Sequence, residues 1–334
     1  MSSSISLVAL TLRRGRVDAI HERHDGLVRL EVDGRPCVAY PHLTGPVALG
    51  DEVLVNVQAL ELELGSGGFD ILYANLTRGL DLDPEPGAHV MKLPYTPLQH
   101  AARHAEEGTE LPGRLDGLPV VATSLHSQLA PVCAGLRDRR VAYIQIAGGA
   151  LPLALSEAVR TLEELGLLHL TIGAGACFGG DADCANVYSG LAVAHARGVD
   201  AVVCGIGPGI VGTGTSLGHG GVVAAAAANA ATALGGTPII APRVSVADER
   251  ERHRGLSHHT LAALELCLGS VKVAWPEGLA APAELHAVEE VDVSGWREAC
   301  AGLPLSHMGR APDEDPDFFT AAFAAGRLAS RLVL

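Results

Sequence analysis

The stretch DAVVCGIGPGIVGTGTSLGHGGVVAAAAANAATALGGTPIIAPR, from Asp200 to Arg243, determines the fold class. It begins with a short apolar run typical of a buried strand, and a glycine-rich loop then leads into an alanine-rich segment of helical length. A second apolar run, TPIIAP, follows. A strand, a helix and another strand in this order predict a parallel pair with the helix packed on one face of the sheet.

The same alternation extends over most of the chain. Strand-like runs such as LPVVATSL, VAYIQIAGG, HLTIGAG and SVKVAWP are separated by segments of helical length. This pattern predicts an α/β domain over residues 116–334, with a doubly wound, mostly parallel sheet of the Rossmann-like kind.

The first part of the chain has a different pattern. Short valine-rich runs of period two, with Asp-Gly and Gly-Asp turns between them, predict a small antiparallel β domain over residues 1–78, either a barrel or a sandwich. The pattern ends in a proline-rich segment that starts near Leu80. Residues 79–115 are therefore interpreted as a linker and crossover.

The composition narrows the class of protein. Hydrophobic residues make up 48% of the 334 residues and charged residues 19%, as in compact folded proteins. The formal net charge of -14 disfavours the basic face that nucleic acids require. The seven cysteines lack the spacing of a metal site, and the apolar runs are shorter than a membrane span. We expect a cytoplasmic protein without nucleic-acid or membrane partners, either alone or as a homo-oligomer.

Five loops are expected at one edge of the α/β sheet, because each follows a strand. Ligands of open α/β sheets bind beyond the carboxyl ends of the strands. All five loops are rich in glycine or polar residues, which favours a site there. They comprise residues 124–128, 147–150, 173–183, 205–221 and 243–259.

Gly207, Gly209 and Gly212 have the spacing of the dinucleotide fingerprint G-x-G-x-x-G. The context disfavours NAD, because the helix begins late, near His219, and the acidic residue expected about twenty residues further on is missing. Two interpretations remain: the glycines serve tight turns and close packing, or the loop binds an anion at the start of a helix. The second interpretation assigns ligand binding to Gly207, Gly209, Gly212, Thr213, Gly214, Thr215 and Ser216.

The segment PRVSVADERERHRGLSHHT, residues 242–260, concentrates arginines and histidines. Arg252 or Arg254 can clamp a phosphate or carboxylate. His258 or His259, together with His219 of the glycine-rich loop, can act as general acid or base. The alternative is an exposed loop in which neighbouring acidic residues neutralise the arginines.

Asp181 and His126 are further candidates at other strand ends. Asp181 can take a proton or bind a cation, or it can cap a helix. His126 can contact the ligand or serve as a hydrogen-bonded structural residue. If His126 and Asp181 meet His219, His258 and His259, the group makes a divalent metal site, although no spacing such as H-E-x-x-H supports one.

Five segments together resemble one bacterial family, catalogued as domain of unknown function 3866. They are MKLPYTPLQ, GGALPLALS, CFGGDADCANVYSGL, GPGIVGTGTSLGHGG and ADERERHRGLSHHTL. The resemblance covers nearly the whole chain and implies that these loops belong to one site. It implies no particular activity, substrate or catalytic residue.

The combined pattern favours a cytoplasmic enzyme of the hydrolase or transferase class. Its substrate is expected to be a small anionic molecule that carries a phosphate or a nucleotide, held by the glycine and threonine loop and by an arginine. A histidine then moves a proton. The alternative is a ligand-sensing or scaffold protein that uses the same pocket without turnover.

Overall fold

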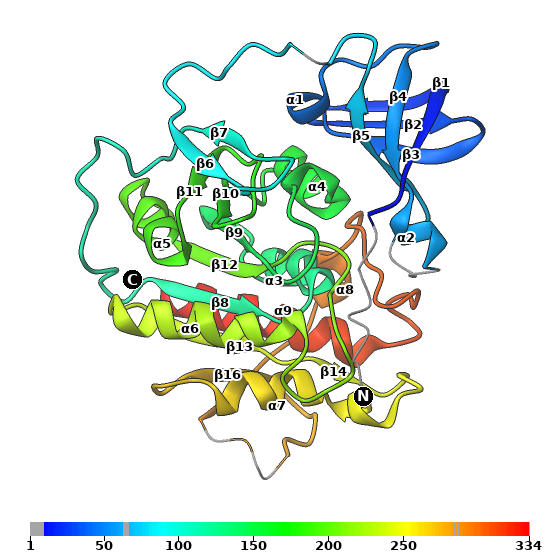
Figure 1. The fold of residues 1–334 in the computed structure, drawn as a ribbon. Coiled ribbons are helices and arrows are strands. Elements are labelled where there is room, and N and C mark those ends of the chain that lie inside the picture. Colours follow the sequence, from blue (N-terminus) through cyan, green and yellow to red (C-terminus); the bar gives the residue numbers. More distant parts are fainter. Residues whose placement is uncertain (1–9, 63–66, 80, 283–284, 286, 334) are drawn as a thin grey trace, which may run out of the picture. The chain divides into compact units, whose positions relative to one another are not determined.

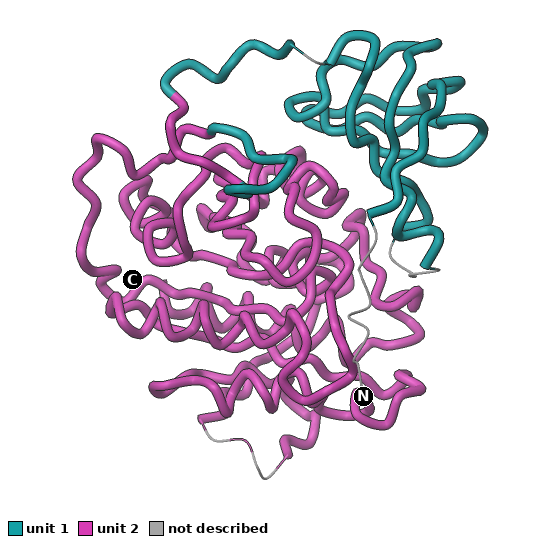
Figure 2. Tube along the Cα trace, in the orientation of Figure 1, with its two compact units in different colours: residues 1–87, 93–101 teal, residues 88–92, 102–334 magenta. Residues whose placement is uncertain are grey.

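The computed structural model describes residues 10–62, 67–79, 81–282, 285 and 287–333. The chain divides into two compact units (Figure 2). One comprises residues 1–87 and 93–101, and the other comprises residues 88–92 and 102–334. The first nine residues, which the sequence assigns to the β domain, lie outside the described part.

The first unit contains a closed β-barrel (Figure 1). Its elements are β1 (Leu12–His24), β2 (Leu27–Val32), β3 (Arg35–Ala39), α1 (Pro41–Thr44), β4 (Glu52–Asn56), α2 (Gln58–Glu61) and β5 (Asp70–Asn75). The strand order around the barrel is β1-β2-β3-β5-β4. Alternate residues such as Val53 and Val55 are fully buried in the barrel core, because successive side chains of a strand point to opposite faces.

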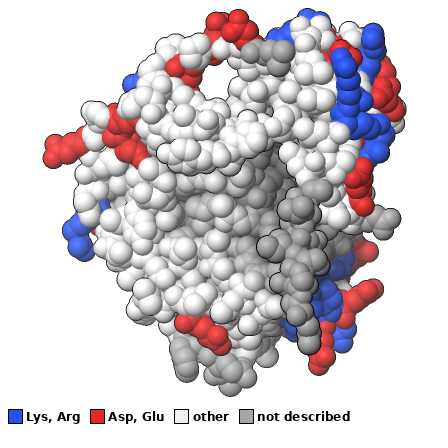
Figure 3. Space-filling model, in the orientation of Figure 1, with Lys and Arg blue, Asp and Glu red and all other residues white. Residues whose placement is uncertain are grey.

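The barrel confirms the predicted small β domain. One feature departs from an all-antiparallel arrangement, because β3 and β5 pair in parallel. The arginines of the barrel are largely paired with acids, for example Arg14 with Glu52 at 2.7 Å and Arg35 with Asp70 at 3.1 Å. Basic and acidic side chains accordingly intermix on the barrel surface drawn in Figure 3.

The second unit contains an eight-stranded sheet. Its strands are β8 (Pro119–Thr123), β9 (Val141–Ile146), β10 (Leu170–Ala174), β11 (Ala182–Cys184), β12 (Ala201–Ile206), β13 (Thr237–Ala241), β16 (Lys272–Pro276) and β17 (Val288–Val291). They lie in the order β11-β10-β9-β12-β8-β13-β16-β17. All neighbouring pairs are parallel, which confirms the predicted sheet.

Helices cover both faces of this sheet (Figure 1). One face carries α3 (Leu129–Gly135), α4 (Glu157–Glu164), α8 (Trp296–Ala299) and α9 (Pro316–Leu332). The other face carries α5 (Val187–Ala196), α6 (Val223–Ala233) and α7 (His258–Glu265). Neighbouring residues of one strand contribute to opposite cores, as Val121 does to the first and Val120 to the second. The fold is therefore doubly wound, as the sequence predicts.

Short elements occupy the connections between these helices and strands. They are β6 (Val90–Lys92), β7 (His100–Ala102), β14 (Val244–Ser245), β15 (Gly255–Leu256), η1 (His126–Gln128), η2 (Leu153–Leu155), η3 (Gly220–Val222) and η4 (Glu251–His253). Three of them, η1, η3 and η4, follow central strands of the sheet: η1 contains His126, η4 contains Arg252, and His219 is the N-cap of η3. Among the described residues, no helix has both the length and the apolar composition needed to cross a bilayer.

Candidate functional site

The chain leaves the neighbouring strands β12 and β8 toward opposite faces of the sheet. After β8 the chain enters α3 on one face, and after β12 it enters α6 on the other. In open α/β sheets, such a divergence marks the place where ligands bind, at the carboxyl ends of the two strands. The loops that follow β12, β8 and β13 therefore define the candidate site.

The glycine-rich loop after β12 folds into a closed turn. Gly212 and His219 face each other across it as an antiparallel bridge, and the Thr213 amide donates to the Gly218 carbonyl oxygen at 2.7 Å. The Thr213 hydroxyl lies 3.0 Å from the Gly218 carbonyl oxygen and 3.0 Å from the Thr215 hydroxyl. The Gly218 amide donates to the Thr215 hydroxyl at 3.0 Å. Both hydroxyls are thus occupied by hydrogen bonds within the turn. The turn contributes to the site by holding His219 in place.

Close backbone packing accounts for several glycines of this region. A side chain at Gly207 would overlap the Ala150 carbonyl, and one at Gly220 would overlap the Gly148 carbonyl. The loop after β9 therefore lies directly against the glycine-rich loop. Gly209 has a φ of 73°, a left-handed conformation that favours glycine. These observations match the packing interpretation of the glycines.

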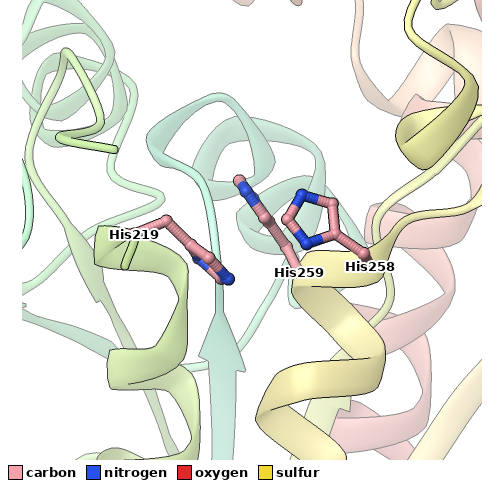
Figure 4. A group of neighbouring side chains, drawn as sticks. All are labelled: His219, His258 and His259. Atoms are coloured by element: carbon pink, nitrogen blue, oxygen red, sulfur yellow. The ribbon is translucent and has the colours of Figure 1, made fainter. Parts of the chain in front are cut away.

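Four histidine side chains, which we call the histidine cluster, gather beside the turn. His219 comes from the loop after β12, and His253, His258 and His259 come from the segment after β13; Figure 4 shows three of them. The rings of His219 and His259 stack, with centroids 3.8 Å apart and 15° between the planes. The ring of His258 lies 4.5 Å from that of His259 and 4.8 Å from that of His253, between centroids. The structure brings the three predicted histidines together and adds His253.

Ser257 holds three of these histidines in place. It is the N-cap of α7, so His258 and His259 are the first two residues of that helix. The Ser257 hydroxyl oxygen accepts a hydrogen bond from the His259 amide at 3.2 Å and lies 2.8 Å from His253 Nδ1. A serine cap is a common local signal, and here it also orients the cluster.

Hydrogen bonds fix the stacked pair in the same tautomer, with the proton on Nε2. His219 Nε2 donates to the Ser216 carbonyl oxygen at 2.9 Å, so the neutral ring carries its lone pair on Nδ1. Arg243 Nη1 donates to His259 Nδ1 at 3.2 Å, so the proton of the neutral His259 ring is on Nε2. Within the described part of the chain, His219 Nδ1 is buried and has no hydrogen-bond partner.

Gly221 packs closely against the two stacked histidines. A Cβ atom at residue 221 would lie 3.1 Å from His219 Nδ1, 3.3 Å from His259 Nδ1 and 3.3 Å from the Ser124 Cβ. These distances are shorter than ordinary van der Waals contacts, so a side chain at this position would crowd both rings.

The histidine cluster is uncharged at neutral pH. Burial and the positive charges of Arg243 and Arg250 lower the pKa of His253 to about 3. Burial and the neighbouring His219 and Arg243 lower the pKa of His259 to about 2. Burial also lowers the pKa values of His219 and His258. Neutral imidazoles can accept protons.

The ring geometry does not suit a metal ion, although nitrogens of His219, His258 and His259 lie within 4.8 Å of one another. A ligating imidazole directs its lone pair within its own plane toward the ion, at about 2.1 Å. The stacked planes of His219 and His259 cannot both contain one ion. Arg243 also donates to His259 Nδ1. The arrangement fits proton transfer better than metal binding.

Arg252 lies at the exposed end of the histidine cluster. Its Nη2 atom is 3.9 Å from the point where a Cβ of Gly214 would stand. Its charge contributes, after burial and His219, to the lowered pKa of His258. Arg254 instead donates from Nε to the Asp248 carbonyl oxygen at 3.4 Å. Of the two arginines predicted to clamp an anion, Arg252 is the one beside both the turn and the histidines.

Charged residues continue inward from His259 and form a second group. Arg243 is 2% exposed and donates from Nη2 to Asp248 Oδ2 at 3.1 Å. Arg250 binds the same carboxylate through Nε and Nη2, each at 2.9 Å. Although burial opposes the shift, these arginines hold the pKa of Asp248 well below its usual range. We call the following residues the inner cluster: Arg243, Asp248, Arg250, His307, Arg310 and Asp315.

His307 and Arg310 belong to the site but were missed by sequence reasoning. They precede α9, whose Phe318 stacks on His307 with centroids 3.6 Å apart. Arg310 Nη2 lies 3.5 Å from Asp248 Oδ2, and its Nε donates to Asp315 Oδ2 at 3.0 Å. The only sequence signal is a histidine and an arginine three residues apart before a helix, which is too common to identify a site.

His126 and Asp181, also predicted as site residues, have hydrogen-bond partners of their own. His126 Nδ1 donates to the Ile206 carbonyl oxygen at 3.0 Å, and its Nε2 lies 2.6 Å from the Ser156 hydroxyl. Asp181 Oδ2 accepts from the Thr171 amide at 2.8 Å and from its hydroxyl at 3.0 Å. Three strand spacings, about 14 Å, separate β11 from β12. The structure does not bring these two residues into the histidine cluster.

A family profile matches most of the chain. The sequence profile described as "Protein of unknown function (DUF3866)" matches residues 36–326, a range that includes the histidine cluster, Arg252 and the inner cluster. No curated protein matches the chain. The match agrees with the resemblance carried by the loop segments.

Proposed function

The chain belongs to the DUF3866 family, and we propose that it is an enzyme acting on a small anionic molecule, with a phosphate or a nucleotide, at the histidine cluster. The observation that carries this proposal is the buried, unpartnered Nδ1 atom of His219. A buried polar atom without a partner destabilises the folded protein. A reacting group bound at the carboxyl edge of the sheet would supply the partner that this atom lacks.

His219 is the general base of the proposed enzyme. Its hydrogen bond to the Ser216 carbonyl leaves the lone pair on Nδ1, and burial lowers its pKa, so the ring is neutral. This lone pair has no partner in the described part of the chain, so it can accept the proton of an attacking water or hydroxyl oxygen. A base in such a position contributes about 10²–10⁴-fold to the rate.

Arg252 is the proposed anion contact. Its side chain is exposed and lies near Gly214 on one side and near His258 on the other. A guanidinium in this place can bind a phosphate through two parallel hydrogen bonds. The threonine hydroxyls of the turn are occupied by other partners, so we assign the charge complementarity to Arg252.

His258 connects the base with solvent. It is the one member of the histidine cluster that is only partly buried, and its ring centroid lies 5.2 Å from that of His219. When the attacking oxygen bonds to phosphorus, its proton moves to His219 Nδ1, and the departing oxygen takes a proton from solvent by way of His258. A water nucleophile makes the enzyme a hydrolase, and a substrate hydroxyl makes it a transferase.

The test first identifies a ligand and then measures turnover. Wild-type protein is screened by thermal shift against nucleotides and sugar phosphates, and each ligand that raises Tm is assayed for phosphate release and for transfer. With such a substrate, His219→Asn should lower kcat by about 10²-fold or more and leave Kd nearly unchanged. Arg252→Ala should raise Kd by about tenfold or more.

Two substitutions at the C-terminal end of α5, one at its C-cap residue Arg197, serve as matched controls. His195→Asn and Arg197→Ala remove the same residue types from the surface, away from the candidate site, and should leave both constants unchanged. If no compound of the panel raises Tm, the proposal fails. A ligand that binds the wild type without any turnover would instead support the ligand-sensing or scaffold alternative.

A further inference from the structure

Three buried nitrogen atoms of the inner cluster point to a second binding site. Arg243 Nε, His307 Nε2 and Arg310 Nη2 have no hydrogen-bond partner in the described part of the chain. Arg243 is 2% exposed and His307 1% exposed, so bulk water does not solvate these side chains. Buried donors without acceptors are rare in folded proteins, and three in one group call for a common ligand.

The charges of the inner cluster do not balance. Arg243, Arg250 and Arg310 carry three positive charges, whereas Asp248 and Asp315 carry two negative charges. Asp248 already accepts hydrogen bonds from Arg243 and Arg250, and Asp315 accepts from Ser245 and Arg310. One positive charge of the inner cluster therefore has no acidic side chain of its own; Arg243 is buried, and Arg310 is 19% exposed.

The unpartnered nitrogens belong to side chains that meet at Asp248. Arg243 Nη2 lies 3.1 Å and Arg310 Nη2 lies 3.5 Å from Asp248 Oδ2. The backbones of His307 and Arg310 are joined by two hydrogen bonds, of 3.0 and 2.9 Å. Burial and then the positive charges of Arg243 and Arg310 lower the pKa of His307 to about 3.

His307 is held by contacts with Ser127 and Phe318, and its Nε2 is buried without a hydrogen-bond partner. Its Nδ1 lies 3.4 Å from the Ser127 hydroxyl, and a hydroxyl that donates to Nδ1 leaves the proton of the neutral ring on Nε2. The ring is fixed between this contact and Phe318, on which it stacks. Two guanidinium groups and one imidazole of the inner cluster thus carry buried N–H groups without acceptors.

We propose that the inner cluster binds one oxyanion, a carboxylate or phosphate group, through Arg243 Nε, Arg310 Nη2 and His307 Nε2. An oxyanion offers the acceptors that all three N–H groups lack. Its negative charge also neutralises the excess positive charge, which neither a water molecule nor a cation would do. The site involves binding alone and does not depend on turnover at the histidine cluster.

The test measures anion binding with inorganic phosphate and with acetate as probes. Trp275 and Trp296 are the two tryptophans of the chain, and both lie in the α/β unit, so their fluorescence reports the Tm of that unit alone. Each probe is titrated at constant ionic strength, with chloride as reference salt. We expect Tm to rise with the logarithm of probe concentration, because a ligand that binds only the folded state stabilises it.

Arg310→Gln is the decisive variant, because it removes the excess charge and keeps a side chain of similar length. The expected result is a Kd for the probe at least about tenfold higher than that of the wild type. Arg297→Gln is the matched control, since Arg297 forms an exposed ion pair with Asp313 at 2.5 Å, and it should keep the wild-type response. If Arg310→Gln does not fold, His307→Gln provides the same comparison.

A response to acetate alone assigns a carboxylate ligand, and a response to phosphate assigns a phosphate group; either supports the site. Equal responses of the wild type and Arg310→Gln would overturn it, as would no response beyond that to chloride. Arg252→Ala separates this site from the proposed enzyme. If that variant loses the response while Arg310→Gln keeps it, the anion binds at the outer arginine only and the inner site is refuted.

Discussion

Lys92 and Arg243 are two buried cations of the same α/β unit, and they differ in their partners. Lys92, 1% exposed, lies at the β10 end of the sheet. Its Nζ donates to the carbonyl oxygens of Gly175 at 2.9 Å and Cys177 at 2.8 Å, with Gly173 and Asp183 also in contact. Arg243 shares its partners with other arginines and keeps one N–H unpaired.

The difference separates a structural cation from a ligand-binding one. The ammonium of Lys92 has more acceptors than hydrogens, so it needs no ligand and instead fixes the loop that joins β10 to β11. Around Arg243 the balance is reversed, because hydrogen-bond donors outnumber hydrogen-bond acceptors. Both residues are buried and charged, so burial alone would not distinguish them; the balance of donors and acceptors does.

Replacing Lys92 should give the largest loss of stability. Lys92→Met leaves several buried carbonyl oxygens without a donor, and removal of one partner from a buried charged contact costs about 3–5 kcal/mol. The measurement is urea unfolding of the α/β unit, followed by tryptophan fluorescence. Lys272→Met removes the other lysine of the chain, which is partly exposed and paired with Glu289 at 2.5 Å, and should cost less than about 1 kcal/mol. Equal effects of the two substitutions would contradict the comparison.

Acid should weaken the α/β unit through its buried histidines. Burial and nearby arginines lower the pKa values of His253 and His307 from 6.5 to about 3, and burial with His219 and Arg243 lowers that of His259 to about 2. The folded state therefore binds fewer protons than the unfolded state below pH 6.5. The stability is complete above that pH and falls as the pH decreases.

The expected loss is about 1 kcal/mol for each of these histidines at about one pH unit below 6.5. Urea unfolding of the wild type at about pH 7.5 and about pH 5.5 measures it. His307→Asn should reduce the pH dependence by the contribution of one histidine, whereas the surface variant His195→Asn should not. A free energy of unfolding that is the same at both pH values would show that the histidines are not held neutral by their surroundings.

The sequence predicted the sheet and the loops at its edge for one reason: parallel strands end at a common edge. Apolar runs that alternate with helical segments defined that edge. His219 follows β12, and His258 and His259 follow β13, which is separated from β12 by β8 alone. The remaining candidates depended on individual contacts. His126 follows a central strand too, yet its two nitrogens bind Ile206 and Ser156.

The inner cluster was beyond sequence reasoning for a different physical reason. His307 and Arg310 lie far along the chain from Arg243, and the packing of α9 against the sheet brings them back to it. No local periodicity encodes such a return. Likewise, Arg250 and Asp248 lie in one loop, and the sequence suggests that their charges cancel. Only the folded structure shows that three arginines of the inner cluster face two aspartates, so that one positive charge remains.

The smallest expected effect concerns the threonines of the glycine-rich turn. Thr213→Val removes a hydroxyl that bonds to the Gly218 carbonyl and the Thr215 hydroxyl. Because both hydrogen bonds are exposed to solvent, their loss should lower the free energy of unfolding by at most about 1 kcal/mol. If the hydroxyl serves only the turn, the Kd of the phosphate-bearing ligand found by the thermal-shift screen should stay within about twofold of the wild-type value. Arg252→Ala in the same assay should weaken binding far more. An equal loss in both variants would mean that the turn opens to bind the anion through its hydroxyls, as the sequence alone suggests, and that the closed turn is its form without ligand.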